Sequence, residues 1–167
     1  MLRVVSRVQL RLPLDAEVTY AGSPVGPGRM LEYPQSQTMQ VYLSYENADK
    51  EFASALSNEL ERRGLSVWLD KRNLLPGDNW SLEIGKALAK SQAMVVLISP
   101  ESMRSNQVRQ EIEYALGNSN YEHRLFPVEV RPTADVPYIL SKFRIMKGTQ
   151  SAAKISQTIA DALGQVA

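Results

Sequence analysis

The sequence predicts an α/β fold in which helices cover both faces of a five-stranded parallel sheet. The first observation behind this prediction is the segment Met94–Ile98, an unbroken apolar run rich in β-branched residues, as in a strand buried on both faces. The second is that strand-like and helical patterns alternate between residues 39 and 163. Because crossovers between parallel strands are right-handed, this alternation places helices on both faces.

Residues 1–38 differ in character from the rest, and we expect an N-terminal extension or linker there, followed by one domain over residues 39–167. Apolar residues alternate with others from Val8 to Leu14, as in a short strand. The Arg-rich, acid-free start also loosely resembles an organelle transit peptide. The stretch 21–38 is rich in Gly and Pro, so it is expected to be a linker, or an arm that docks on the domain or on a partner.

The domain is expected to begin with a strand, a helix and a second strand. Asn47 or Asp49 is placed to cap the helix, and Gly64 to end it. The predicted elements are a strand at Val41–Ser44, a helix with Phe52, Leu56 and Leu60 on its apolar face, and a strand at Leu65–Leu69.

A polar loop, DKRNLLPGDNW, follows the second strand, and its Pro76-Gly77 pair indicates a turn. Asp78 is placed to cap a helix over Trp80–Lys90 that can bury Leu82, Ile84, Ala87 and Leu88. After the strand Met94–Ile98, Ser99-Pro100 ends the apolar run, and a helix follows with Val108, Ile112 and Ala115 or Leu116 on one face.

Two further strands and a last helix complete the pattern. Pro127, inside the fourth strand, indicates a position near the sheet edge or a local irregularity. The predicted elements are strands at Leu125–Val130 and Phe143–Met146, one turn at Tyr138–Ser141 between them, and a helix from about Ser151 to Leu163 that buries Ile155, Ile159 and Leu163 and stops at Gly164.

For five such strands we expect the flavodoxin-like order 2-1-3-4-5. In open sheets of this kind ligands bind outside the carboxyl ends of the strands, where the winding direction reverses, here between strands 1 and 3. The loops after Ser44, Leu69 and Ile98 should therefore converge on one crevice. Glu111 lies one or two turns along the helix that leaves the third strand.

Composition excludes several classes of function. The net charge is +1, from 19 basic and 18 acidic residues, so no global field favours nucleic acid or a membrane surface. The chain has no cysteine, which excludes disulfides and thiolate chemistry, and a single histidine, His123, in a polar loop. We therefore expect a soluble, cytoplasmic protein without a metal site, since no apolar run approaches the roughly 18 residues of a membrane span.

The residues that remain for chemistry are carboxylates. Neither G-x-G-x-x-G nor G-x-x-x-x-G-K-[ST] occurs, so the common phosphate-binding loops are absent. A carboxylate in a polar crevice suits chemistry at an oxocarbenium-like centre, such as cleavage of a glycosidic bond. A helical glutamate is ordinarily exposed, but Glu111 borders the Val108/Ile112 face, whereas Glu113 points to solvent and Glu83 is interpreted as a plain surface residue.

Three segments together carry a family resemblance: VYLSYENADKEFASALSNEL, GLSVWLDKRNLLPGDNW and AMVVLISPESMRSNQVRQEIEYAL. In this order and spacing they resemble a Toll/interleukin-1 receptor (TIR) domain of the bacterial kind, over about Met39–Leu163. The first carries the strand motif that ends in Ser44-Tyr45. The second resembles the BB loop of that family, with Arg72, Pro76 and Gly77 in its signature.

The resemblance implies a flavodoxin-like fold and one of two functions. Many TIR domains cleave NAD+ at the nicotinamide-ribose bond and give ADP-ribose or cyclic isomers, often in anti-phage immunity, with NAD+ as substrate and no cofactor. Others act as non-catalytic modules through TIR-TIR association. By the same resemblance, self-association would involve the BB loop, Arg72 to Trp80, and a separate effector protein would receive the signal.

The resemblance also assigns roles to residues. Catalytic members carry a pattern like Ser-x-Trp-x-x-x-Glu, in which Ser105 and Glu111 match, so the catalytic role passes to Glu111. Gln107 stands at the position of the tryptophan. A glutamine there offers hydrogen bonds, whereas an indole offers a flat apolar wall. Tyr45 or Trp80 is an alternative aromatic surface, and Trp68 is expected in the core. The implied substrate contacts are Ser44, Tyr45, Asp70, Leu75, Gly77 and Gln107.

A flavodoxin-like receiver or flavin carrier shares the predicted fold. A receiver needs an acidic cluster after strand 1 and an aspartate at the end of strand 3, but Ser99 stands at the latter position. The residues at the predicted crevice therefore favour the TIR interpretation.

Overall fold

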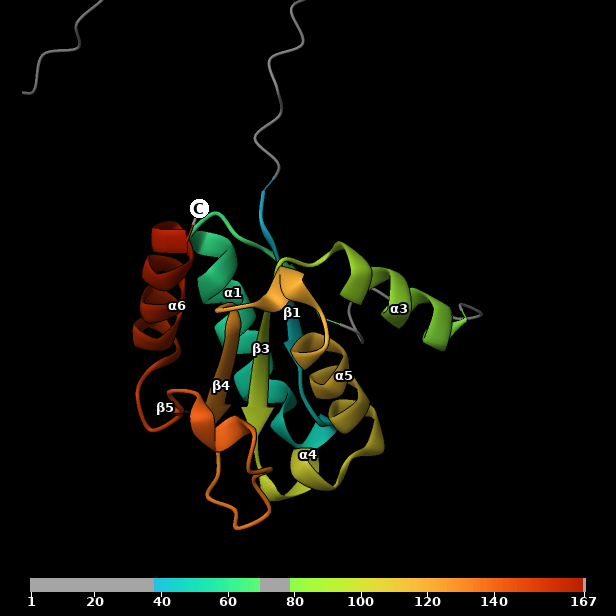
Figure 1. The fold of residues 1–167 in the computed structure, drawn as a ribbon. Helices are drawn as coiled ribbons and strands as arrows, with labels where there is room; N and C mark the ends of the chain where they lie inside the picture. Colours follow the sequence, from blue (N-terminus) through green and yellow to red (C-terminus); the bar gives the residue numbers. More distant parts are fainter. Residues whose placement is uncertain (1–37, 70–78, 167) are drawn as a thin grey trace, which may run out of the picture. The chain divides into compact units, whose positions relative to one another are not determined.

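The computed structural model describes residues 38–69 and 79–166, and the sheet they form has the predicted arrangement. Its five strands are parallel and lie in the order β2-β1-β3-β4-β5 (Figure 1). The strands are β1 Gln40–Ser44, β2 Ser66–Trp68, β3 Ala93–Ile98, β4 Leu125–Glu129 and β5 Met146–Lys147. The predicted N-terminal strand and linker, the Pro76-Gly77 turn and the Asp78 cap lie outside the described residues.

Helices cover both faces of this sheet, as predicted. In Figure 1, α1 and α6 lie along one face, α4 and α5 along the other, and α3 extends away from the sheet. The helices are α1 Lys50–Arg62, α3 Trp80–Lys90, α4 Pro100–Arg104, α5 Asn106–Leu116 and α6 Ala152–Val166, with short 3-10 helices η1 Asn47–Asp49, η2 Ser119–Tyr121 and η3 Leu140–Lys142.

The alternation of side chains along the central strands divides the core into two layers. In β3, Val95 and Leu97 face α1 and α6, where they pack with residues such as Leu56 and Ile159. Met94, Val96 and Ile98 face the other way and pack with Val108 and Ile112 of α5. Successive strand residues point to opposite faces, so β1 is divided in the same way: Val41, Leu43 and Tyr45 belong to the first layer and Tyr42 to the second.

Pro127 occupies the kind of position that its missing N–H allows. Around it, Val130 N donates to Ile98 O on the β3 side, and Glu129 O accepts from Gly148 N on the β5 side. Because hydrogen bonding alternates along a strand, position 127 faces the β5 side, where the pairing of β4 with β5 begins only at Val128. Pro127 is thus in register with Val96 of β3 and has no ladder partner on the β5 side.

The helix predicted after β3 is two helices, because the chain turns at Ser105. Ser99 and Ser102 form a capping box at the start of α4, and Pro100 occupies its first turn. Ser105 ends α4 in an extended conformation, and its side chain accepts a hydrogen bond from Val108 N at the start of α5. A serine serves as the cap of each helix, which the apolar pattern alone does not reveal.

Three smaller predictions were wrong. The fifth strand is Met146–Lys147 rather than Phe143–Met146, because Phe143 ends η3 and packs on the α5 side of the core. Gly164 lies inside α6, which continues to Val166. Leu82 is 53% exposed, since the first turn of α3 stands away from the core and only Ala87 and Leu88 of this helix are buried.

Candidate active site

Glu111 of α5 is buried, with 3% of its surface exposed. This burial follows from the helix phase predicted above, since Glu111 borders the stripe that packs Val108 and Ile112 against the sheet. A carboxylate in such a place must be hydrogen-bonded, because an unpaired buried charge costs far more than folding can supply.

Three donors surround the Glu111 carboxylate. Tyr42 Oη donates to Oε1 at 2.7 Å, and Ser44 Oγ donates to Oε2 at 2.5 Å. Gln107, one helical turn before Glu111, donates to Oε1 through Nε2 at 3.0 Å. Charge-assisted hydrogen bonds of this kind favour the ionised carboxylate and restrict its orientation.

The strand β1 explains how two of these donors come together. Tyr42 and Ser44 are two residues apart, so both side chains point to the α5 face of the sheet. Trp68, the residue paired with Tyr42 on β2, stacks on its ring with centroids 4.9 Å apart and planes at 17°. Tyr42 was not predicted as a site residue, although its two-residue spacing from Ser44 was the signal that would have found it.

The structure brings only part of the predicted site together. Ser44 and Gln107 lie against Glu111, as just described. Tyr45 is buried in the core layer on the α1 and α6 side, so its ring is not brought to Glu111. Asp70, Leu75 and Gly77 lie outside the described residues. Trp68 packs against the core and is only partly buried.

Glu111 lines a cavity of about 460 Å³ between α3 and α5. This volume is in the range of small-molecule sites. Two walls carry aromatic side chains, Trp80 from α3 and Tyr114 from α5. Among the described residues that line the cavity, Glu111 has the only charged side chain: the others are Trp80, Ser81, Ile84, Gly85, Leu88, Gln107, Gln110 and Tyr114.

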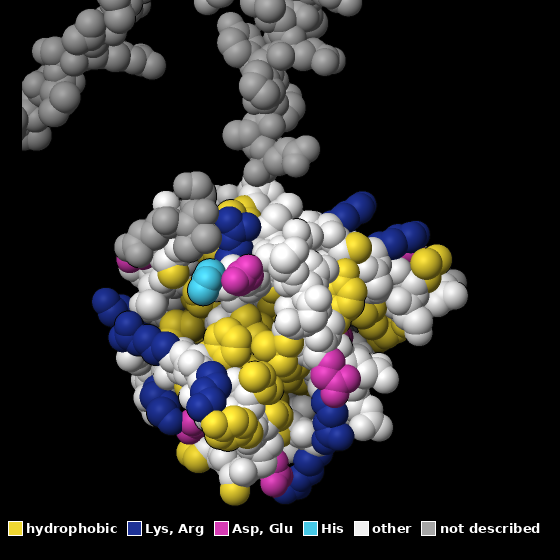
Figure 2. All heavy atoms as spheres, in the orientation of Figure 1, with side chains coloured by type: hydrophobic (Ala, Val, Ile, Leu, Met, Phe, Trp, Pro, Cys, Tyr) yellow, Lys and Arg dark blue, Asp and Glu magenta, His cyan; other side chains and the backbone are white. Residues whose placement is uncertain are grey.

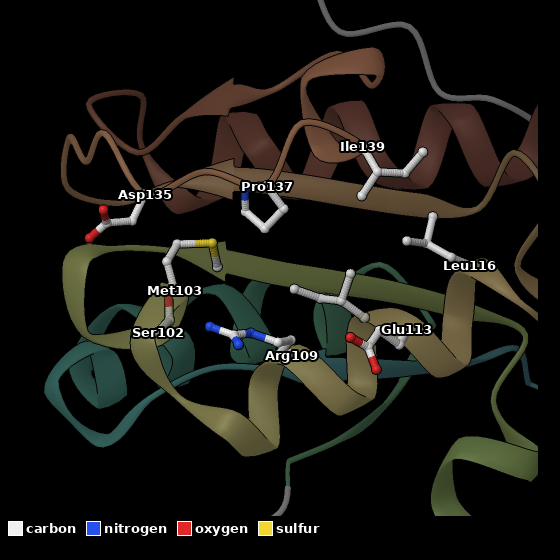
Figure 3. A pocket seen from close by; sticks show the side chains of 9 residues that line it. Ser102, Met103, Arg109, Glu113, Leu116, Asp135, Pro137 and Ile139 are labelled. Carbon is white, nitrogen blue, oxygen red and sulfur yellow. The ribbon is translucent and has the colours of Figure 1, made fainter.

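A second cavity of about 310 Å³ lies on the other side of α5 (Figure 3). Its walls are mostly apolar, with Met103, Pro137 and Ile139 beside Arg109 and Glu113. Hydrophobic side chains gather over the middle of the face seen in Figure 2, and the partly exposed Ile139 and Leu116 belong to this cavity. Glu113 is exposed, as predicted, and no buried carboxylate is among the residues described as lining this cavity.

A second polar cluster joins the loops after β1, β3 and β4. The buried Asp49 accepts from Ser99 Oγ at 2.5 Å and from Arg131 at 2.8 Å. Arg131 also pairs with Glu101 at 2.7 Å. A backbone N–H at Glu101 and then the Arg131 guanidinium lower the pKa of Glu101, and the hydrogen bond to Asp49 is the main cause that raises the pKa of Arg131. Asp49 thus makes no cap hydrogen bond to α1, contrary to the role predicted for it.

The single histidine and the acidic side chains bear on metal binding, and the helices bear on membrane crossing. His123 is exposed, as predicted, and takes a left-handed backbone conformation with φ 59°. In the part of the chain that the structure describes, no group of three His, Asp or Glu side chains is placed to hold a metal ion. None of the helices within residues 38–69 and 79–166 combines the length and the apolar character that a membrane crossing requires.

A flavodoxin-like domain with a buried glutamate at the wall of a cavity defines the class of this protein. The family model of the TIR domain matches residues 41–163, and the chain belongs to this family. Solved structures show the same fold. The TIR domain of the Toll-related receptor TRR-2 from Hydra magnipapillata is 23% identical with a TM-score of 0.60, over 75% of this chain and 95% of that one. A metazoan TIR-STING receptor from C. gigas in complex with 2',3'-cGAMP is 24% identical with a TM-score of 0.60, over 72% and 39%.

Two curated relatives are similar over part of their length. The NAD(+) hydrolase TcpA of Theionarchaea archaeon (strain DG-70-1) is 30% identical over 102 residues, which cover 60% of this chain and 31% of TcpA. The probable 2' cyclic ADP-D-ribose synthase TcpO of Methanobrevibacter olleyae is 28% identical over 89 residues, which cover 53% and 26%. The chain therefore spans less than a third of the length of these relatives.

Proposed function

We propose that this chain cleaves the bond between nicotinamide and ribose in NAD+, with Glu111 as the catalytic carboxylate, and gives ADP-ribose or a cyclic ADP-ribose-type product. The observation that carries the proposal is a buried glutamate that accepts three hydrogen bonds and lines a cavity. The names of the two curated relatives, a NAD(+) hydrolase and a probable 2' cyclic ADP-D-ribose synthase, support the same chemistry.

The reaction follows from the charge of Glu111. As the glycosidic C–N bond breaks, its electron pair moves to the pyridinium nitrogen, and nicotinamide leaves as a neutral molecule. The ribose carbon gains positive charge, which an oriented carboxylate stabilises. Water then captures the sugar and loses a proton to give ADP-ribose, or a nitrogen of the substrate's own adenine captures it to give a cyclic isomer. NAD+ is the substrate, and the proposal requires no cofactor.

The first experiment incubates the purified full chain with NAD+ at low and high protein concentration, and follows nucleotides by chromatography and mass spectrometry. Glu111→Gln should lose turnover, because the neutral amide cannot stabilise the developing charge. Glu113→Gln is the matched control, since Glu113 is on the same helix but exposed. Turnover that survives in Glu111→Gln, or that falls equally in both variants, would contradict the assignment.

The remaining site residues of the resemblance have separate proposed roles. Ser44 donates to Glu111, so we assign it to the orientation of the carboxylate. Gln107 lines the cavity, so we assign it to contact with the substrate. We keep Asp70, Leu75 and Gly77 as proposed substrate contacts, with Asp70 on a ribose hydroxyl, and we limit the proposed contact of Tyr45 to its backbone, since its side chain is buried in the other core layer. Asp70→Asn should raise KM for NAD+ with little change in kcat, and an unchanged KM would remove Asp70 from the site.

A second candidate function is assembly through TIR-TIR contacts without catalysis. Two large apolar side chains on the first turn of α3 favour it: Trp80 is 49% exposed and Leu82 is 53% exposed. They adjoin the loop Arg72 to Trp80, which we propose as the self-association segment. Sedimentation of wild type and Leu82→Asp over a range of concentrations tests this. Equal molecular masses at every concentration would leave this surface without a role in assembly.

We also propose a setting for the product, as a signal that a separate effector protein receives during anti-phage immunity. The support is the family resemblance. Plaque counts on cells that express wild type or Glu111→Gln together with neighbouring genes test it. Protection that does not depend on Glu111 would separate immunity from the NAD+ chemistry.

A further inference from the structure

Gln107 raises a question about how this site holds a ring. The catalytic pattern that this chain resembles has a tryptophan there, whereas Gln107 turns its amide to Glu111 Oε1. The cavity nevertheless has aromatic walls. Trp80 and Tyr114 line it together with Glu111, from two different helices.

Tyr114 is held in a defined orientation beside Glu111. It lies three residues further along α5, which places both side chains on neighbouring parts of one helix face. Its ring meets Tyr121 edge to face, with centroids 6.3 Å apart and planes at 80°, and its Oη accepts from Asn118 Nδ2 at 3.2 Å. A ring braced on its edge and at its hydroxyl can present a face to the cavity at low entropic cost.

Trp80 is on the opposite wall, at the start of α3. The buried residues Ala87 and Leu88 fix the far end of this helix, and Tyr121 Oη donates to the Leu88 carbonyl at 2.6 Å. Tyr121 therefore touches α3 through its hydroxyl and Tyr114 through its ring. One buried side chain thus contacts both helices that form the walls.

The charge of the cavity selects the ligand class. The Glu111 carboxyl group accepts hydrogen bonds from three donors, as an ionised carboxylate does, and the residues described as lining the cavity include no Lys or Arg. Aromatic faces attract cations through the ring quadrupole. A flat organic cation satisfies both features. The N-alkylated pyridinium of NAD+ is such a cation, whereas free nicotinamide and the dihydropyridine of NADH are neutral.

We propose that Trp80 and Tyr114 are specificity-determining residues that hold the cationic pyridinium ring against Glu111, in place of the indole that position 107 lacks. The identity of the ring rests on the proposed function. Recognition of a flat cation, however, needs no turnover, so it is measured with a ligand that the enzyme cannot cleave at a glycosidic bond.

The experiment uses 1-methylnicotinamide as the cation and nicotinamide as its neutral counterpart. The chain has two tryptophans, so Trp68→Phe leaves Trp80 as the single fluorophore and keeps a ring stacked on Tyr42. We expect saturable quenching by 1-methylnicotinamide and at least about tenfold weaker binding of nicotinamide, a ratio equal to about 1.4 kcal/mol. Collisional quenching is linear in concentration and is distinguished by its failure to saturate.

Variants of the walls complete the test. Tyr114→Leu, made in the Trp68→Phe protein, should weaken binding of the cation about tenfold, and Trp80→Leu, followed by calorimetry in the wild-type background, should do the same. Tyr138→Leu is the control, since Tyr138 is 74% exposed and is not among the residues that line this cavity. Circular dichroism tests whether each variant is folded. If Tyr114→Leu does not fold, the test relies on Trp80→Leu.

Three results would overturn the inference: quenching that does not saturate, equal binding of cation and neutral ring, or binding that neither wall variant weakens. The outcome is separable from the proposed function. Saturable binding of 1-methylnicotinamide without NAD+ cleavage keeps the cation site and refutes the enzyme. NAD+ cleavage that is indifferent to both wall variants keeps the enzyme and refutes the aromatic walls.

Discussion

Tyr42→Phe removes a single oxygen atom next to the proposed catalytic group. The hydroxyl is buried and donates to Glu111 Oε1 at 2.7 Å, while the ring stacks on Trp68 and is kept by phenylalanine. A hydrogen bond to a charged group contributes about 1.5–3 kcal/mol. If the carboxylate needs this donor to hold its position in the transition state, kcat for NAD+ cleavage falls about 10- to 150-fold.

The Michaelis constant separates positioning from substrate binding. Tyr42 is not among the residues that line the cavity, so its loss should leave KM for NAD+ nearly unchanged. The assay is initial-rate kinetics on purified wild type and Tyr42→Phe, with unfolding in urea measured on the same samples. The urea data should show a loss of about 1.5–3 kcal/mol, the contribution of a hydrogen bond to a charged group.

Ser156→Ala is the matched control for this prediction. Ser156 is a buried hydroxyl that accepts from Arg63 and donates to the Ala153 carbonyl, on the face of the sheet opposite Glu111. It should cost about 1 kcal/mol of stability and leave kcat unchanged. A folded Tyr42→Phe protein with wild-type kcat would refute the positioning role, and a raised KM with unchanged kcat would show that the hydroxyl contacts the substrate.

Three further predictions concern the frame around the site. Asp49→Ala should lower the free energy of unfolding by about 2 kcal/mol in urea titrations, because it removes the buried acceptor of the Ser99 hydroxyl and one of the two carboxylate partners of the half-exposed Arg131; a loss below about 0.5 kcal/mol would contradict this. Gly148→Ala should destabilise by about 1–3 kcal/mol, since a Cβ there lies 2.9 Å from backbone atoms of the β4 end, whereas Gly164→Ala in α6 has open space and should stabilise by about 0.5–1 kcal/mol. The lowered pKa of Glu101 means that its contribution is present above its ordinary pKa of 4.5 and is lost as the pH falls through the lowered pKa, so Glu101→Gln should differ from wild type at about pH 7 and converge with it on acidification. A difference that stays constant on acidification would refute the linkage.

The sheet order was predictable because the apolar strands and helical faces alternate with little ambiguity. Met94–Ile98 is buried along its whole length, as its composition predicts. The helix ends were harder. The break at Ser105 depends on a serine side chain that caps a new helix, and Gly164 is in α6 because a glycine ends a helix only where the backbone turns left-handed.

The candidate site was predictable where its residues follow the periodicity of a single element. Helix phase placed Glu111 at the border of the buried face, and the family resemblance gave it a role. The phenol of Tyr42 comes from another element, and its hydrogen bond to Glu111 depends on how β1 lies against α5. The Asp49–Arg131 ion pair joins residues 82 positions apart, and nothing in local periodicity indicates it.

The two halves of the cavity are built in different ways. Glu111 is tied by hydroxyls to the central strand β1, while the wall that carries Trp80 belongs to a helix whose first turn stands free of the core. Substitutions in that turn can therefore change which ligands fit the cavity without displacing the carboxylate. Under the proposed function, substitutions on α3 would alter which nucleotide is accepted and would leave the carboxylate that acts on the glycosidic bond in place.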